Sequence, residues 1–204
     1  NDDKELTYKF YLSIRLISYI VFPMMIGLAI LSEPLIILIL TEKWIEVVPY
    51  MQILCLAYMW EPIMHITWSL LNVKHRSDFS LKSEIIKKII AVTILFATIP
   101  LGIKTMCIGL IIYSLFDITI ISKFTCKILP EITTKNIFKN TTSILLQSII
   151  MGVIVYLFTQ LITNLWIQLF GGIIIGFITY ILLSFYLCKK EFNYIILLLK
   201  RIKQ

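Results

Sequence analysis

Long apolar runs recur along this chain, and they restrict its possible folds more than any other feature. At least six stretches of roughly 20 residues are nearly free of charge, and one helix needs about 20 apolar residues to cross a hydrocarbon core. The sequence therefore predicts an all-α fold, a polytopic transmembrane helix bundle within residues 1–188. The six predicted spans are residues 10–31, 47–71, 85–101, 106–125, 143–163 and 165–187. The amphipathic segment 189–204 is expected to lie along the cytoplasmic membrane surface.

The composition argues against a soluble protein and against nucleic-acid binding. Hydrophobic residues make up 59% of the chain and charged residues only 15%, whereas a soluble domain is about 25% charged. The net charge of +7 comes from loops between spans, a pattern typical of topology signals and contact with anionic lipid headgroups. The four cysteines lack the spacing of a zinc site or a disulfide framework. Motifs of catalytic and nucleotide-binding sites are missing, so neither an enzyme nor a metal or other cofactor is predicted.

The distribution of lysine and arginine predicts the orientation in the membrane. Basic residues concentrate before the first span, in the two loops around residues 72–88 and 123–139, and in the tail. The loops on the opposite side contain only Lys43 and Lys104. Because positively charged loops stay in the cytoplasm, both termini of the chain are expected to be cytoplasmic.

Two acidic residues lie near the middle of predicted spans, Glu61 in the second and Asp117 in the fourth. A charge at this depth costs about 2.5–3.5 kcal/mol on insertion scales. We expect each acid to line a hydrated cavity, to couple to protons or to pair with a cation. The alternative is a neutral carboxyl that is hydrogen-bonded to a neighbouring helix. Pro62 predicts a kink beside Glu61, because proline lacks the amide that would bond to the Tyr58 carbonyl.

Helical spacing places further polar side chains on the face of Glu61. His65, Trp68 and Asn72 follow it at i+4, i+7 and i+11, and side chains with such spacing share one side of a helix. This stripe is a candidate substrate path from the middle of the membrane to the cytoplasm. The alternative is ordinary packing between helices.

Four basic residues near the cytoplasmic ends of spans have two possible roles. Each side chain can extend to the lipid headgroups, or it can hold a phosphate group. Arg15 is assigned to the substrate path, and the other three are candidates for phosphate or headgroup contact: Lys87, Lys88 and Lys123. Separately, Gly172 and Gly176 form a GxxxG pattern in the last span, which predicts close helix packing.

A family resemblance covers about residues 10–90. It is carried by Phe22-Pro23, Gly27-Leu28, Ser32-Glu33-Pro34-Leu35-Ile36, Thr41-Glu42-Lys43-Trp44, Val48-Pro49-Tyr50-Met51-Gln52-Ile53-Leu54, Leu71-Asn72-Val73-Lys74-His75-Arg76-Ser77-Asp78 and Glu84-Ile85-Ile86-Lys87-Lys88. The chain resembles bacterial polysaccharide and O-antigen flippases of the multidrug/oligosaccharidyl-lipid/polysaccharide exporter superfamily. Beyond residue 90 the similarity is in hydropathy alone.

The resemblance implies a fourteen-helix transporter with two lobes, of which this chain would be the last six helices. Such proteins move undecaprenyl-diphosphate-linked oligosaccharide across the bacterial inner membrane for lipopolysaccharide or capsule synthesis. Alternating access around a cationic cavity is implied, often coupled to an ion gradient. The implied partners are the lipid-linked oligosaccharide, membrane lipids, the N-terminal lobe of the parent protein and the polysaccharide polymerase or ligase machinery. The start at Asn1, without an initiator Met or a signal peptide, agrees with an expected fragment.

Three alternatives to a flippase remain open. The first is a cation-coupled drug or metabolite antiporter of the same superfamily, with a compact acidic site. The second is a membrane-embedded polymerase or ligase acting on polyprenyl-linked sugars, which needs a long outward loop or a catalytic acid or histidine cluster. The third is the membrane half of a nucleotide-driven exporter, which needs long cytoplasmic helix extensions.

Overall fold

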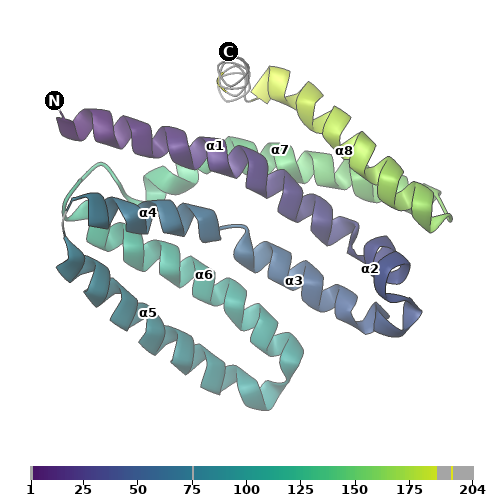
Figure 1. Cartoon of the computed structure of the whole chain (residues 1–204), viewed down its shortest axis with the longest axis horizontal. Coiled ribbons are helices and arrows are strands. Elements are labelled where there is room, and N and C mark those ends of the chain that lie inside the picture. Colours follow the sequence, from purple (N-terminus) through teal and green to yellow (C-terminus); the bar gives the residue numbers. More distant parts are fainter. Residues whose placement is uncertain (1, 75, 188–193, 195–204) are drawn as a thin grey trace. The chain divides into compact units, whose positions relative to one another are not determined.

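The computed structural model describes residues 2–74, 76–187 and 194, and this part of the chain is helical almost throughout (Figure 1). The α-helices are α1 (Asp2–Ile30), α2 (Ser32–Leu40), α3 (Val48–Tyr58), α4 (Glu61–Val73), α5 (Ser77–Thr98), α6 (Ile103–Cys126), α7 (Thr134–Leu161) and α8 (Leu165–Leu187). Two short 3₁₀ helices, η1 (Glu42–Val47) and η2 (Ile99–Leu101), complete the elements. No strand occurs among the described residues, which confirms the all-α class. The predicted surface segment 189–204 lies, except for Tyr194, outside the described residues.

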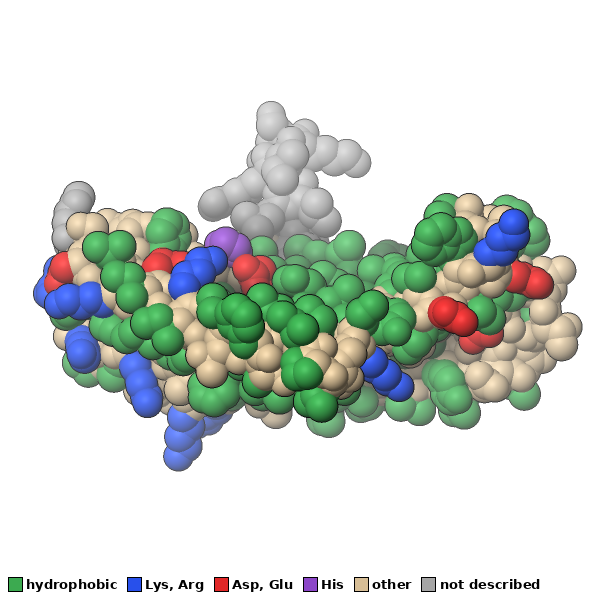
Figure 2. All heavy atoms as spheres, turned by 90° about the horizontal axis from the view of Figure 1, so that it is seen from below, with side chains coloured by type: hydrophobic (Ala, Val, Ile, Leu, Met, Phe, Trp, Pro, Cys, Tyr) green, Lys and Arg blue, Asp and Glu red, His purple; other side chains and the backbone are tan. Residues whose placement is uncertain are grey.

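Four helices are long and apolar enough to cross a membrane: Asp3–Ile30, Ile103–Cys126, Thr134–Leu161 and Leu165–Tyr186. They coincide with four of the six predicted spans. Large apolar side chains on α8 are exposed, with Phe177 at 67% and Ile173 at 53%, and Figure 2 shows many hydrophobic side chains at the surface. A surface of this kind is stable when lipid covers it. The chain is a multi-pass membrane protein.

The other two predicted spans have more complex structures. The predicted span 47–71 is divided into α3 and α4, which are separated by Met59 and Trp60. Neither helix alone has the length to cross a bilayer. The predicted span 85–101 belongs to α5, which begins earlier, at Ser77, and has charged residues in its first half. That these segments cross the membrane therefore stays a prediction.

The chain forms two compact units, each made of separate segments. The first unit comprises Asn1–Ile14 and Ile53–Asn140. The second unit comprises Arg15–Gln52 and Thr141–Gln204.

In the first unit, α4, α5 and α6 pack against one another. Large apolar side chains of α4 and α6 are buried, including Ile63, Leu71 and Ile118. The connection from α5 to α6 turns at Gly102, whose φ of 92° is a backbone conformation that favours glycine. A Cβ atom at Gly109 would lie 3.0 Å from Cγ2 of Ile94, so the small residue allows α6 to approach α5 closely.

In the second unit, a buried hydrogen-bond network joins α1, α7 and α8. The hydroxyl groups of Tyr19 and Ser184 are 2.5 Å apart, and the Tyr180 hydroxyl donates to the carbonyl of Tyr19 at 2.7 Å. Nε2 of Gln147 donates to Ser184 at 2.6 Å and to the Tyr180 carbonyl at 3.0 Å. Polar side chains of this kind connect helices inside a membrane.

Glycines bring the helices of the second unit together. A Cβ at Gly172 would lie 2.7 Å from Cδ2 of Leu31, and one at Gly176 would lie 3.3 Å from Cγ2 of Val155. The predicted packing role of this GxxxG pattern is confirmed. The turn between α7 and α8 is short, and the Asn164 side chain accepts a hydrogen bond from the amide of Trp166 at the start of α8.

Candidate functional site

The candidate site begins where α4 starts, beside Pro62. Trp60 is the residue before the helix, and Pro62 occupies its first turn, where an amide has no intrahelical partner and proline is well tolerated. The helix is interrupted near Pro62, as predicted. The chain forms two separate helices, α3 and α4, rather than one kinked helix, so Glu61 lies in the first turn of α4.

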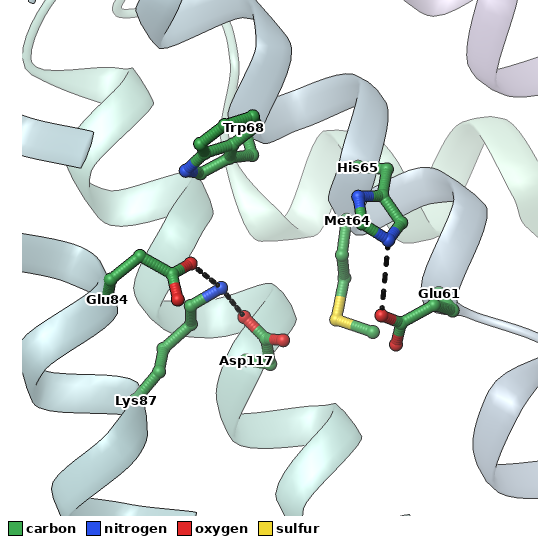
Figure 3. A pocket seen from close by; sticks show the side chains of 7 residues that line it. All are labelled: Glu61, Met64, His65, Trp68, Glu84, Lys87 and Asp117. Carbon is green, nitrogen blue, oxygen red and sulfur yellow. Dashed lines mark ion pairs between the residues drawn. The ribbon is translucent and has the colours of Figure 1, made fainter. Parts of the chain in front are cut away.

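A cavity of about 330 Å³ opens between α4, α5 and α6 in the first unit (Figure 3). Its lining contains three acids, one lysine, one histidine and two large side chains: Glu61, Met64, His65, Trp68, Glu84, Lys87 and Asp117. The structure thus brings together five predicted site residues from three helices. Glu84 and Met64 complete the lining.

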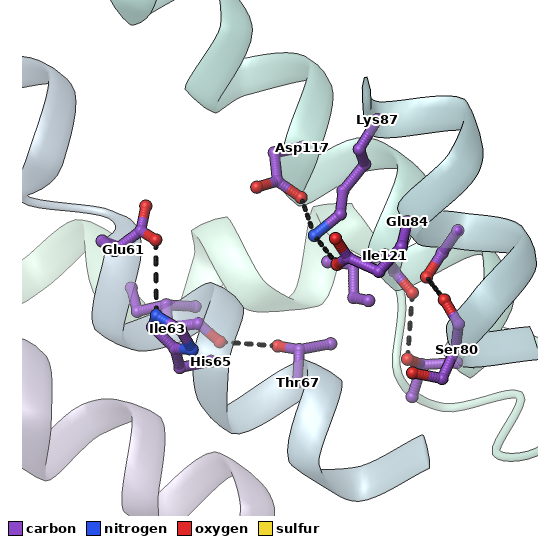
Figure 4. Close-up of polar contacts among 11 residues, drawn as sticks. Glu61, Ile63, His65, Thr67, Ser80, Glu84, Lys87, Asp117 and Ile121 are labelled. Atoms are coloured by element: carbon purple, nitrogen blue, oxygen red, sulfur yellow. Dashed lines mark hydrogen bonds and ion pairs between the residues drawn. The ribbon is translucent and has the colours of Figure 1, made fainter. Parts of the chain in front are cut away.

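Lys87 is the centre of an ion network inside this cavity. Its Nζ atom lies 2.5 Å from Oε1 of Glu84 and 3.1 Å from Oδ1 of Asp117, as Figure 4 shows. The side chains of Lys87 and Asp117 are only 10% and 7% exposed. Two buried charges are tolerated when they neutralise each other, so this pair explains how Asp117 can lie within a spanning helix.

The Lys87 ammonium is buried against carboxylates of α5 and α6. Its predicted contact with a phosphate or a headgroup stays a prediction. Glu84 was not among the predicted site residues. A usable signal was present, because Glu84 precedes Lys87 by three residues and such pairs share a helix face.

A second pair lies at the more exposed part of the cavity. Nε2 of His65 is 3.3 Å from Oε1 of Glu61, one helical turn away, and these side chains are 71% and 44% exposed. The predicted stripe on α4 is present for Glu61, His65 and Trp68. Asn72 is exposed in the last turn of α4 and does not line the cavity.

Trp68 contributes an unusual polar group. Its indole Nε1 is buried and makes no hydrogen bond with any described residue, while the side chain lines the cavity. A buried donor without a partner is costly. A cavity of this size accommodates several water molecules, so a polar molecule entering the cavity can accept this hydrogen bond.

The remaining predicted cations lie elsewhere. Lys88 and Lys123 are exposed, and Arg15 is partly buried in the second unit. Their proposed contacts with phosphate or headgroups stay predictions. Within the described residues, no group of three or more histidine, cysteine, aspartate or glutamate side chains can hold a metal ion.

A charged and aromatic cluster marks the start of α5, outside the predicted span. Nε and Nη2 of Arg76 donate to the two carboxylate oxygens of Asp78 at 3.0 and 3.1 Å. This hydrogen-bonded guanidinium holds the pKa of Asp78 below its ordinary value. The guanidinium also lies 3.9 Å from the ring centroid of Phe79, a cation–π arrangement.

Comparisons with known proteins agree with this architecture. Residues 1–49 match the model of a family described as "Polysaccharide biosynthesis protein". A protein of Klebsiella pneumoniae, "Uncharacterized membrane protein in cps region", is 36% identical over 113 residues, which cover 54% of this chain and 23% of that protein. The resemblance to the polysaccharide flippase family is confirmed.

A second relative supports the same family. "Lipopolysaccharide biosynthesis protein WzxC" of Escherichia coli strain K12 is 31% identical over 87 residues, which cover 43% of this chain and 18% of that protein. The chain thus matches about a fifth of the length of these two relatives. No solved structure matches the chain.

Proposed function

We propose that the protein containing this chain is a flippase, not an enzyme, and that it moves undecaprenyl-diphosphate-linked oligosaccharide across the bacterial inner membrane. Its product would serve lipopolysaccharide or capsular polysaccharide synthesis. The observation that carries this proposal is the similarity to membrane proteins named for the cps region and for lipopolysaccharide biosynthesis. The family description, polysaccharide biosynthesis, agrees with it.

The physical task suits a multi-pass helical protein with a polar interior. A sugar diphosphate cannot cross hydrocarbon alone, because its many polar groups would lose their hydrogen bonds with water. A polar route between helices replaces those hydrogen bonds, while the lipid tail stays in the bilayer. The cavity of the first unit shows that these helices can form a polar space.

The chain supplies only part of this route in our proposal. The other part belongs to an N-terminal lobe of the parent protein, and alternating access moves the two lobes around the headgroup. Both termini of the chain face the cytoplasm, where the basic loops contact anionic lipids. We therefore expect that residues 1–204 alone do not transport.

A second candidate function is a cation-coupled drug or metabolite antiporter of the same superfamily. The observation that favours it is the acidic character of the cavity, where three carboxylates surround one lysine. Such a site attracts cations more readily than a diphosphate.

Deletion of the parent gene in its own host separates these functions. If the proposal holds, undecaprenyl-diphosphate-linked oligosaccharide accumulates on the inner leaflet and the surface polysaccharide is lost, and plasmid-borne protein restores both. Unchanged pools of lipid-linked oligosaccharide contradict the flippase and leave the antiporter. Single oligosaccharide units that reach the outer leaflet but remain unpolymerised indicate a polymerase or ligase instead.

A further inference from the structure

Pro23 leaves a gap in the backbone hydrogen bonds of α1. It lies inside the helix, and proline has no amide to donate to the carbonyl four residues earlier, which is that of Tyr19. The proline ring also crowds this carbonyl, and helices bend at such positions. A buried carbonyl needs a donor, above all in a helix that crosses a membrane. A donor from another helix can close this gap.

The helix α8 supplies that donor. The Tyr180 hydroxyl donates to the Tyr19 carbonyl at 2.7 Å, and the two ring centroids are 5.0 Å apart. Both side chains are buried, and the two residues are 161 positions apart in the sequence. A side chain of α8 thus takes the place of the backbone amide that α1 lacks at Pro23.

The neighbouring acceptors determine the direction of each hydrogen bond. The Ser184 hydroxyl donates to the Tyr180 carbonyl at 2.7 Å. In the 2.5 Å contact between Tyr19 and Ser184, the tyrosine hydroxyl is therefore the donor, because a hydroxyl carries one proton. Tyr19 of α1 donates to α8, and Tyr180 of α8 donates to α1. Only the second of these bonds reaches the backbone carbonyl that Pro23 leaves without its amide.

Two further features favour a hinge over a rigid joint at this position. Oε1 of Gln147 and Oγ of Ser18 are buried and make no hydrogen bond with any described residue, so this network is less stable than a fully paired one. Gly27 lies one turn after Pro23, and nothing lies within 4 Å of a Cβ added there. Packing therefore does not require a glycine at this position, and both residues weaken a helix.

The contacts beyond the break are apolar. Ile26 of α1 lies against Gly152 of α7, and Leu31 lies against Gly172 of α8. Contacts of this kind limit how closely the helices approach, but they are non-directional. The Tyr180 hydroxyl, in contrast, constrains the direction of α1 at the break itself.

We propose that residues 19–27 of α1 form a hinge that the Tyr180 hydroxyl holds closed, so that bending of α1 and separation of α8 from α1 occur together. While the hydroxyl is in place, the Tyr19 carbonyl is paired and α1 keeps the geometry of this structure. When α8 withdraws the hydroxyl, Pro23 has no amide to replace it, and the helix bends there. This inference concerns the second unit alone and goes beyond the proposed function, because it holds whatever the protein carries.

A double-mutant cycle tests whether the hydroxyl replaces the missing amide. Hydrogen exchange of α1 amides is measured in the full-length protein in lipid nanodiscs, for Tyr180→Phe, Pro23→Ala, the double variant and the unaltered protein. Tyr180→Phe should accelerate exchange at residues 20–27 about fivefold or more, because a buried carbonyl loses its donor. In the Pro23→Ala background the same change should stay within about twofold, because a backbone amide then pairs with the Tyr19 carbonyl. An equal acceleration in both backgrounds overturns the proposal.

Two matched variants separate this coupling from a general loss of packing. Tyr19→Phe removes a hydroxyl of the same network but leaves the Tyr19 carbonyl bonded to Tyr180, so its effect should be the same with Pro23 and with Pro23→Ala. Tyr156→Phe removes a hydroxyl from an exposed position on α7 and should change nothing. A Tyr19→Phe effect that depends on the residue at position 23 as strongly as that of Tyr180→Phe overturns the assignment to Tyr180.

Distances between spin labels test the hinge itself, and neither measurement requires transport. In a cysteine-free full-length protein, labels are attached at Ile39→Cys on α2 and Ile178→Cys on α8, both exposed positions. The distance distribution should be broader in Tyr180→Phe than in the unaltered protein, and addition of Pro23→Ala should make it narrow again. This recovery also shows that the variant folds. An unchanged distribution in Tyr180→Phe, or a broad one that Pro23→Ala does not correct, overturns the hinge.

Discussion

Asp117 and Lys87 show how a buried charged residue depends on its partner. Each charge alone is unfavourable to bury, and together they are 3.1 Å apart with little exposure. Lys87→Met should therefore lower the free energy of unfolding by about 3–5 kcal/mol, because it leaves Asp117 uncompensated. The double variant Lys87→Met with Asp117→Leu should recover much of this loss. Thermal unfolding in mild detergent measures both.

Lys88→Met is the control for this pair. Lys88 is the exposed neighbour of Lys87 on α5, and we expect a change within about 0.5 kcal/mol. If Lys87→Met is equally harmless, the ion pair does not stabilise the first unit.

The Arg76–Asp78 pair should make the stability of the folded state depend on pH. Hydrogen bonding to Arg76 lowers the pKa of Asp78, so the pair stabilises the folded state above the ordinary pKa of aspartate. This contribution is lost as the pH falls through the lowered value. In carboxyl-carbon NMR, Arg76→Gln should move the midpoint of Asp78 up, toward about 3.9. An unchanged midpoint would contradict the structural role of the guanidinium.

At the scale of elements, close helix contacts in the second unit depend on glycine. A Cβ at Gly152 on α7 would lie 2.7 Å from Cγ2 of Ile26 on α1. This atom is on a β-branched side chain with few alternative rotamers, and Ile26 is buried. Gly152→Ala should therefore destabilise the protein by about 1–3 kcal/mol, as measured by thermal unfolding.

Gly27→Ala is the matched control for this substitution. Gly27 is also within a helix, but nothing lies within 4 Å of an added Cβ, and alanine favours helix more than glycine by about 1 kcal/mol. Its melting temperature should stay constant or rise. A decrease as large as that of Gly152→Ala would show that backbone effects, and not packing, determine both results.

Sequence patterns predicted some elements better than others, for physical reasons. The hairpin of α7 and α8 could be predicted because its two helices correspond to two long apolar runs of sequence. Only three residues separate these helices, Ile162, Thr163 and Asn164. The division at Met59 and Trp60 could not, since both residues are apolar and continue the hydropathy of the run. Pro62 indicated that the helix was disturbed there, but proline is compatible with a kink and with a helix start.

The sequence predicted which site residues share one helix better than which site residues of different helices come into contact. Spacing placed Glu61, His65 and Trp68 on one face of α4, because helical periodicity is a local property. The pairing of Lys87 with Asp117 joins residues 30 positions apart, and depends on how α5 packs against α6. Hydropathy alone does not contain that information, so contact of Lys87 with lipid headgroups was also compatible with the sequence.

At the scale of the whole molecule, the number of membrane crossings decides which ends of the helices share a side. If α3–α4 and α5 both cross, the connections at residues 41–47, 99–102 and 162–164 face outward, while those at 74–76 and 127–133 are cytoplasmic. The basic residues favour this arrangement, because Lys127 and Arg76 belong to the second group.

Cysteine labelling of intact cells tests this topology. In a cysteine-free full-length protein, the exposed positions Glu42, Leu101 and Thr163, each changed to Cys, should react with a membrane-impermeant maleimide added outside. Lys127→Cys and Glu131→Cys should react only after the cells are permeabilised. The Leu101→Cys variant is decisive, because η2 follows directly on α5. Protection of Leu101→Cys in intact cells, with labelling after permeabilisation, would mean that α5 does not cross, and that the cavity at Lys87 lies near the cytoplasmic surface rather than within the membrane.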